Sequence, residues 1–258
     1  MDHHRTDGHP IAWITGGATG IGFATAQALG AAGYTVLLSG RRRDELERAA
    51  AALGAAGVSA ETWPLDVADP DAVDAAATAI AERHGRIDAL VLASGINVPD
   101  RHWQSLSADG FAKVVAVNLN GVAYCVAAAL PAMRRAGSGT IVVISSWAGW
   151  RLLPVSGVAY GASKQGLAPL VELINHQEGH RGIRATLLCP GEVATPMMRQ
   201  RPVPPPAADL EKMLRPEDVA SAIHYVVTAP PRVCINELVI APSWNRIYLG
   251  ADDLKLPR

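Results

Sequence analysis

The sequence is poor in cysteine: Cys125, Cys189 and Cys234 are the only three in 258 residues, and they lie far apart without paired spacing. This spacing supports neither a disulfide framework nor a zinc knuckle, and it fits a reducing cytoplasm. The eight histidines are scattered and form no His-Glu-x-x-His pattern. The sequence therefore predicts no catalytic metal.

An excess of charge of one sign is also missing. The chain carries 23 Lys and Arg against 24 Asp and Glu, a formal net charge of -1. Such a balance leaves no overall field to hold a polyanion such as nucleic acid. The first ten residues, MDHHRTDGHP, contain no apolar stretch that could act as a signal peptide. We therefore expect a protein that binds no nucleic acid and is not exported.

One uncharged run challenges the interpretation of the chain as a soluble protein. Val114 to Met133 forms 20 consecutive residues without a charge, about the length that spans a bilayer. Its contents argue against a membrane span, because Asn118, Asn120 and Gly121 lie near its start, Pro131 lies near its end, and much of the remainder is Ala. The segment is better explained as a helix buried on most sides, in the core or against a second subunit.

What the sequence does contain is an alternation of short β-branched runs with longer Ala-rich segments, which predicts βαβ units. The runs expected as strands are Ile11 to Thr15, Thr35 to Ser39, Ala60 to Pro64, Ala89 to Ala93, Thr140 to Ser145, Arg184 to Cys189 and Glu237 to Ile240. The segments expected as helices are Ile21 to Ala32, Arg42 to Leu53, Pro70 to Arg83, Ala108 to Met133, Val158 to Glu178 and Pro216 to Thr228. We expect residues 1–258 to form one α/β domain of Rossmann type, a doubly wound, seven-stranded parallel sheet with helices on both faces.

One irregular segment interrupts this pattern. Arg201 to Pro206 reads RPVPPP, with four prolines in six positions, and can be neither a helix nor a central strand. A linker between domains is one interpretation. The strand pattern resumes at Glu237, however, so a surface loop within one domain is the better one.

A glycine-rich turn, TGGATGIG, directly follows the first predicted strand and precedes an apolar helix. Glycines let the backbone approach a phosphate, and the helix N-terminus offers unpaired N–H groups to a pyrophosphate. A glycine cluster alone is equally typical of an ordinary turn. Its position between the first strand and first helix favours a nucleotide site, with contacts from Gly16, Thr19, Gly20, Ile21 and Gly22.

The second predicted strand ends in Ser39-Gly40-Arg41-Arg42-Arg43, where an NAD-specific site places an Asp or Glu on the ribose 2′-hydroxyl. Guanidinium groups in place of a carboxylate favour NADP, because they can bind a 2′-phosphate. Arg41 is the first expected contact and Arg42 the second; the alternative is a solvated surface run. Asp66, which with Val67 follows the third strand, is a candidate either for the adenine amino group or for capping the next turn.

Tyr160 and Lys164 lie four positions apart in a predicted helix, which puts both on one face. An ammonium beside a phenol favours the phenolate, and lowering a tyrosine pKa from about 10 to about 7 needs roughly 4 kcal/mol of differential interaction. Such a pair alone is usually amphipathic surface. The pair Ser145-Ser146 favours a functional interpretation, because it ends the fifth strand at the edge where open α/β sheets bind ligands.

In these motifs the sequence resembles the short-chain dehydrogenase/reductase family over nearly its whole length. The Thr-Gly-x-x-x-Gly-Ile-Gly turn, the serine, the Tyr-x-x-x-Lys pair and the segment PGEVATP at 190–196 match in order and spacing. The resemblance implies that Ser146 polarises the substrate carbonyl and that Tyr160 is the proton donor or acceptor. It also implies that Lys164 lowers the tyrosine pKa and holds the nicotinamide ribose.

The resemblance implies further roles in the same site. Asn118 matches the family's fourth active-site member and would hold a water that links Lys164 to solvent; the alternative is a structural asparagine. Thr195 would contact the nicotinamide carboxamide, and Val193 would line the same pocket. Residues 196–215, with their prolines, occupy the family's substrate-lid position.

Some features depart from the family pattern. The family's Asn-Asn-Ala-Gly after the fourth strand is Leu-Ala-Ser-Gly here, so only Gly95 carries over and both amides are lost. Residues 230–242 lack the common glycine pair and are similar to the ending of an NADP-preferring subset. Trp103, Trp147 and Trp150 are candidates for the walls of a substrate pocket, with core packing the equal alternative.

The sequence thus predicts an NADP(H)-dependent oxidoreductase that transfers hydride between the nicotinamide and a small carbonyl or secondary-alcohol substrate. One alternative is an NAD-linked alcohol dehydrogenase, which the 2′-phosphate contact at Arg41 would exclude. Another is a cofactor-binding scaffold without turnover, against which the intact serine, tyrosine and lysine argue. We expect a cytoplasmic homotetramer or homodimer that packs through Val114 to Met133 and Ala162 to Leu173.

Overall fold

The computed structural model describes residues 8–251 and residue 254. Residues 1–7, 252–253 and 255–258 lie outside the described part of the chain. The expected extent of the domain over residues 1–258 and the expected lack of a signal peptide therefore fall partly outside it.

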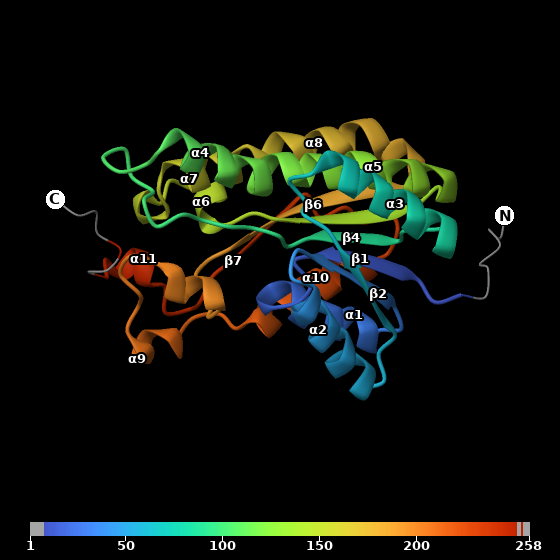
Figure 1. Ribbon diagram of the computed structural model, residues 1–258, viewed down its shortest axis with the longest axis horizontal. Helices are drawn as coiled ribbons and strands as arrows, with labels where there is room; N and C mark the ends of the chain where they lie inside the picture. The colour runs from blue at the N-terminus through green and yellow to red at the C-terminus, as the bar shows by residue number, and fades with distance from the viewer. Residues whose placement is uncertain (1–7, 252–253, 255–258) are drawn as a thin grey trace.

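A parallel sheet of seven strands forms the centre of the described chain, in the order β3-β2-β1-β4-β5-β6-β7 (Figure 1). The strands are β1 (Ile11–Thr15), β2 (Thr35–Gly40), β3 (Ala60–Pro64), β4 (Ala89–Leu92), β5 (Gly139–Ile144), β6 (Ile183–Pro190) and β7 (Glu237–Ile240). Strands β1, β4 and β5 are buried along their whole length, because a parallel sheet is covered on both faces. The predicted Rossmann-type sheet is confirmed, and each strand lies within one residue or so of its predicted bounds.

Helices cover both faces of this sheet, with α1, α2 and α10 on one face and α3, α5 and α8 on the other (Figure 1). The helices of at least eight residues are α1 (Gly20–Ala31), α2 (Arg43–Ala55), α3 (Pro70–His84), α4 (Ala108–Val115), α5 (Gly121–Ala136), α7 (Val158–Gln165), α8 (Leu167–Glu178) and α10 (Pro216–Thr228). The shorter ones are α6 (Trp147–Trp150), α9 (Ala207–Leu210) and α11 (Arg246–Leu249), with the turns η1 (Ala116–Asn120), η2 (Pro154–Ser156), η3 (Gly179–Arg181) and η4 (Pro196–Gln200). Two apolar clusters, one on each side of the sheet, form the core.

The long uncharged segment is one continuous helical run, Ala108–Ala136, in which η1 is a π-helical turn between α4 and α5. By length and composition this run could cross a membrane, and half of its apolar window is buried inside the fold. Cys125, Ala129 and Met133 belong to the core cluster on that face of the sheet. The predicted helical extent is right, but the sequence pattern did not predict the π-turn, a feature frequent at functional sites.

The strand order places β1 beside β4, where the sequence of strands reverses direction across the sheet. The segments after these two strands therefore diverge to opposite faces and leave a crevice at their carboxyl ends. Open α/β sheets bind ligands at this topological switch point.

The proline-rich segment Arg201 to Pro206 forms neither helix nor strand, as predicted. It lies between η4 and α9, and the chain then returns to the end of β6, where Val193 and Leu214 form an isolated bridge. The Ala194 N–H donates to the Leu214 carbonyl at 2.8 Å, and the Leu214 N–H donates to the Glu192 carbonyl at 3.1 Å. Residues 196–215 are thus a loop anchored at both ends beside the carboxyl edge of the sheet.

Candidate active site

A cavity of about 490 Å³ opens at the carboxyl ends of the central strands. Its volume falls in the range typical of small-molecule sites. All predicted site residues except Asn118 line it: Gly16, Thr19, Gly20, Ile21, Gly22, Arg41, Arg42, Asp66, Val67, Gly95, Ser146, Tyr160, Lys164, Val193 and Thr195. The fold thus brings the glycine turn, the arginine segment and the Ser-Tyr-Lys set to one site.

The glycine turn between β1 and α1 is shaped for close backbone approach. Gly16 has a φ of +66°, and a Cβ on Gly22 would lie 2.2 Å from the Gly16 carbonyl oxygen, so a side chain would open the turn. Thr19, at the start of α1, makes no side-chain capping bond. The unpaired N–H groups of this first turn therefore remain for a phosphate, which fits the pyrophosphate of a dinucleotide. A Cβ on Gly20 would lie 3.4 Å from Thr195, so the loop after β6 faces the turn.

The arginines after β2 differ in how they are engaged. Arg42 Nη2 lies 2.6 Å from Glu45 Oε2, whereas Arg41 is exposed and forms no hydrogen bond or ion pair with the described part of the chain. Arg41 is therefore the guanidinium that remains for a ligand. Asp66 lines the cavity, and its Oδ1 accepts from the Ala68 N–H at 3.0 Å. The turn-capping alternative for Asp66 is thus observed.

Tyr160 and Lys164 share one face of α7, and the Lys164 Nζ lies 5.8 Å from the centroid of the tyrosine ring. The lysine is only 4% exposed and donates to the Ile144 carbonyl at 2.7 Å. Burial lowers the pKa of Lys164 to about 8. The ammonium is therefore about half deprotonated near pH 8 unless a ligand stabilises its charge.

Burial raises the pKa of the Tyr160 hydroxyl above its ordinary value. A side-chain hydrogen bond with Ser146 opposes this shift most strongly, followed by the positive charges of Arg201 and Arg101. The predicted influence of Lys164 is not among these effects. Two arginines that sequence reasoning missed therefore act on the tyrosine.

The two serines after β5 have separate surroundings. Ser145 is buried and donates to the Lys164 carbonyl at 2.9 Å, which ties α7 to the end of β5. Ser146 caps α6, and its Oγ accepts from the Ala148 N–H at 3.2 Å while it also meets Tyr160. Ser146 is therefore the serine beside the tyrosine hydroxyl, as the family resemblance implies.

Asn118 is fully buried in the π-turn and is absent from the cavity lining. Its Oδ1 accepts from the Ile96 N–H at 2.8 Å, and its Nδ2 donates to the Ile96 carbonyl at 2.9 Å and to Ser163 Oγ at 3.2 Å. Both polar atoms are thus engaged by the protein. This matches the structural alternative, and the water-holding role stays a prediction.

The Leu-Ala-Ser-Gly segment at the end of β4, which departs from the family pattern, is held by hydrogen bonds on two sides. The Ser94 N–H donates to Thr15 Oγ1 at 3.4 Å, and the Ala93 N–H donates to the Thr15 carbonyl at 3.2 Å. The Asn118 amide holds the backbone of Ile96 on the other side. A Cβ on Gly95 would lie 3.6 Å from Lys164 Nζ. These contacts hold the segment without the two amides that it lacks.

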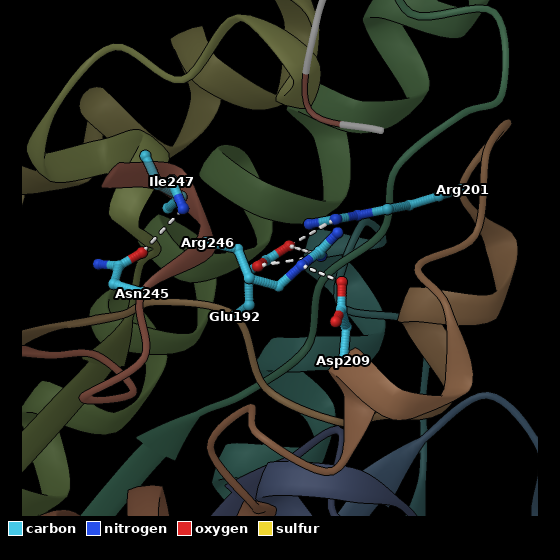
Figure 2. A network of polar contacts seen from close by, with 6 residues as sticks. All are labelled: Glu192, Arg201, Asp209, Asn245, Arg246 and Ile247. Carbon is cyan, nitrogen blue, oxygen red and sulfur yellow. Dashed lines mark hydrogen bonds and ion pairs between the residues drawn. The ribbon is translucent and has the colours of Figure 1, made fainter. Parts of the chain in front are cut away.

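A buried network of charges joins residues 196–215 to α11 (Figure 2). This segment is named the lid loop, after the position that the family resemblance implies for it. Glu192 is 3% exposed, and its Oε1 lies 2.6 Å from Arg201 Nη1 and 3.2 Å from Arg246 Nη1. On its other side, Arg246 Nε lies 2.9 Å from Asp209 Oδ2. Asn245 caps α11 by accepting from the Ile247 N–H at 3.0 Å. Sequence reasoning missed this network; its one signal is a glutamate, Glu192, just past the end of β6.

Arg101 is a second missed residue, in the irregular segment between β4 and α4. It lines the cavity, is 5% exposed, and donates through Nε to the Val98 carbonyl at 2.9 Å. Its own carbonyl accepts from the Val158 N–H at 2.9 Å, at the start of α7. No pattern in the sequence indicates that this arginine reaches the site.

Among the tryptophans, Trp147 lines the cavity, as predicted. It packs edge-on against Trp150 at 5.0 Å and against Tyr248 at 5.4 Å between ring centroids. Trp103 is 80% exposed, and neither it nor Trp150 is part of the lining. The prediction of a pocket wall is thus right for Trp147 and wrong for the other two.

No group of three His, Cys, Asp or Glu side chains within residues 8–251 and 254 is placed to hold a metal ion. The three cysteines are free. Burial raises the pKa of Cys125 to about 12 and that of Cys189 to about 11, so both thiols are protonated at neutral pH and are weak nucleophiles.

The family model for short chain dehydrogenase matches residues 10–204. The chain belongs to the short-chain dehydrogenase family. This short-chain dehydrogenase is 32% identical to an uncharacterized oxidoreductase, SSP1627, of Staphylococcus saprophyticus, over 89% of its own length and 94% of that protein. It is also 33% identical to the glycine betaine reductase ATRR of Emericella nidulans, over 90% of its length but only 18% of that much longer protein.

Among solved structures, the short-chain dehydrogenase is similar to an alcohol dehydrogenase from the archaeon Thermococcus sibiricus complexed with 5-hydroxy-NADP. The TM-score is 0.82 at 30% sequence identity, and the match covers 92% of this chain and 98% of that one. The similarity thus extends over the sheet and the helices on both of its faces.

Proposed function

We propose that this short-chain dehydrogenase is an NADP(H)-dependent oxidoreductase that acts on a small carbonyl or secondary-alcohol substrate. One observation carries the proposal: a single cavity is lined by the glycine turn at the free N-terminus of α1 and by Ser146, Tyr160 and Lys164. The nicotinamide, when bound, supplies or accepts the hydride. The side chains of the cavity then have to orient the substrate and move one proton.

The raised pKa of Tyr160 suits a proton donor, because the hydroxyl remains protonated at neutral pH. In reduction Tyr160 gives this proton to the carbonyl oxygen, and in oxidation its phenolate form takes the proton from the alcohol. Ser146, whose side chain lowers the tyrosine pKa, polarises the same oxygen. Lys164, beside Tyr160, holds the ribose hydroxyls and supplies positive charge when a bound dinucleotide keeps it protonated.

NADP is the proposed cofactor because Arg41 remains for a 2′-phosphate and the end of β2 carries no carboxylate. The bound 5-hydroxy-NADP in the Thermococcus sibiricus structure supports the same choice. A charged phosphate contact contributes roughly 1.5 to 3 kcal/mol, about tenfold or more in affinity.

Titration of the protein with NADPH and with NADH, followed by nucleotide fluorescence, tests this preference. We expect tighter binding of NADPH and a smaller gap in Arg41→Ala. Arg43→Ala is the matched control, because Arg43 is exposed and is not part of the cavity lining. Equal affinity for both nucleotides, or a preference for NADH, would favour the NAD-linked alternative.

Loss of NADPH absorbance with a panel of aliphatic and aromatic ketones and aldehydes tests the activity itself. Turnover of any member supports the oxidoreductase. Tight NADPH binding without turnover across the panel, or in the reverse direction with secondary alcohols, would favour the scaffold alternative. The three free cysteines suit the cytoplasm as the proposed location of this activity.

A further inference from the structure

Two arginines, Arg101 and Arg201, line the cavity together with the proposed catalytic tyrosine. We propose that they bind a carboxylate of the substrate, so that the substrate is an oxo acid and the product the corresponding hydroxy acid. This inference rests on the proposed function and narrows its substrate class.

Of the two arginines, Arg101 gives the stronger evidence for an anion site. Arg101 is 5% exposed, and its Nε donates a hydrogen bond to the Val98 carbonyl. Neither its Nη1 nor its Nη2 has a hydrogen bond or ion pair with any residue that the structure describes. A buried guanidinium without a counter-ion is costly, and proteins pair such groups as a rule. Arg101 instead faces the cavity, where a ligand anion would complete the pair.

Arg201 approaches the same cavity from the lid loop, and its guanidinium belongs to the buried network of charges. Its Nη1 pairs with Glu192, which it shares with Arg246. Arg246 in turn pairs with Asp209. These two arginines are matched by two carboxylates, so the positive charge left beside the tyrosine without a counter-ion among the described residues is that of Arg101. A bound carboxylate would balance it.

Electrostatic coupling agrees with this geometry. The pKa of Arg101 is lowered, first by burial and then by the positive charge of Arg201, so the two guanidinium groups repel each other. Both also act on Tyr160. An anion between them would relieve the repulsion and would lie close to the proton donor.

The anion is assigned to the substrate because the cofactor's phosphates have other partners. The pyrophosphate falls to the glycine turn after β1, and the 2′-phosphate to Arg41 after β2. Arg101 and Arg201 belong to the β4–α4 segment and to the loop after Thr195. A carboxylate fits both the planar fork of a guanidinium and the limited room beside a dinucleotide in a cavity of about 490 Å³.

The test compares matched pairs of acids and esters as substrates with NADPH: pyruvate, acetoacetate and levulinate, each against its methyl ester. For at least one pair we expect kcat/KM for the acid to exceed that for the ester by at least about tenfold. In Arg101→Gln, the loss on the acid should exceed the loss on the ester by at least about tenfold. Arg199→Gln is the matched control, because Arg199 is exposed in η4 and does not line the cavity. It should keep the acid preference.

Esters reduced as well as or better than the acids by the wild-type protein would overturn the inference. An equal loss on acid and ester in Arg101→Gln would also overturn it, since that pattern indicates a structural role. Arg101→Lys keeps the charge without the fork and should retain part of the acid preference. If Arg101→Gln fails to fold, the acid and ester substrates are compared in Arg101→Lys instead.

Calorimetric titration of the NADP complex with glutarate separates this inference from the proposed function. If neither acids nor esters consume NADPH, the proposed function fails, and glutarate binding still decides the anion site. Binding that weakens by at least about tenfold in Arg101→Gln would support the site. Absence of binding to the wild-type protein, or equal binding to the variant, would overturn it.

Discussion

At the scale of single residues, Lys164 shows how burial prepares a group for a ligand. Its pKa falls from 10.5 to about 8 because the ammonium is buried inside the fold, and the Ile144 carbonyl is the one acceptor that the described chain offers it. The lowered value means that folding opposes protonation of this lysine. A bound ligand with acceptor oxygens beside Nζ would restore the charge.

This shift predicts a pH dependence of stability. Between pH 10.5 and about 8 the unfolded chain binds more protons at Lys164 than the folded chain, so the free energy of unfolding rises with pH across this window. Relative to Lys164→Met, the cofactor-free wild-type protein should gain about 2 kcal/mol between about pH 7.5 and about pH 10. Urea unfolding of both proteins at the two pH values measures the difference. The same pH slope in both would show that the lysine is not depressed.

Residue-scale prediction from the sequence found residues that line the cavity where they belong to short motifs with a fixed spacing. The glycine turn, Ser146 and the Tyr160–Lys164 pair were found because each is a short motif at a strand end or on one helix face. Arg101 and Arg201 were not found, since their approach to Tyr160 depends on two irregular segments about a hundred residues apart in the chain. Periodicity carries no information about such segments.

At the scale of elements, the lid loop is attached to the sheet through the buried network of Glu192, Arg201, Arg246 and Asp209 (Figure 2). The network joins the end of β6, the segment before α9 and the start of α11. Because every member is partly or fully buried, removal of one charge leaves another unbalanced.

Glu192→Gln should therefore destabilise the chain by about 3 kcal/mol, because Arg246 keeps only Asp209 and Arg201 loses its partner. Chemical denaturation measures this loss. Glu211→Gln is the matched control, since Glu211 is exposed in the same loop and should change stability by less than about 0.5 kcal/mol. Equal effects of the two substitutions would mean that the network contributes nothing to the anchoring of the loop.

Elements were predictable to the extent that their hydrophobic period was long and regular. All seven strands appear because β-branched apolar runs between turns are the signature of a covered parallel sheet. The helix α6 was missed because four residues are too few for a period. The π-turn at Ala116–Asn120 was missed because the prediction of one long helix rested on an uncharged composition, which does not reveal a single extra residue.

At the scale of the whole molecule, assembly stays a prediction. Leu173 on α8 is 50% exposed, on the face of the sheet that also carries α5. Burial of this face against a second copy would remove apolar surface from water. Light scattering should give a dimer or tetramer of the 27.1 kDa chain.

Leu173→Asp should shift this assembly toward the monomer. Val203→Asp, at a side chain that is 59% exposed in the lid loop, is the control and should leave the mass unchanged. A monomeric wild-type protein at micromolar concentration would contradict the prediction.

The central claim, that this short-chain dehydrogenase moves a proton through Tyr160 while NADPH supplies hydride, is tested most directly by Tyr160→Phe. This change keeps the ring and removes only the hydroxyl. The dissociation constant for NADPH and kcat for the best carbonyl substrate are measured on the same preparation. The account predicts NADPH binding close to that of the wild type and a kcat lower by roughly 10² to 10⁴. A near-normal kcat in Tyr160→Phe would contradict it.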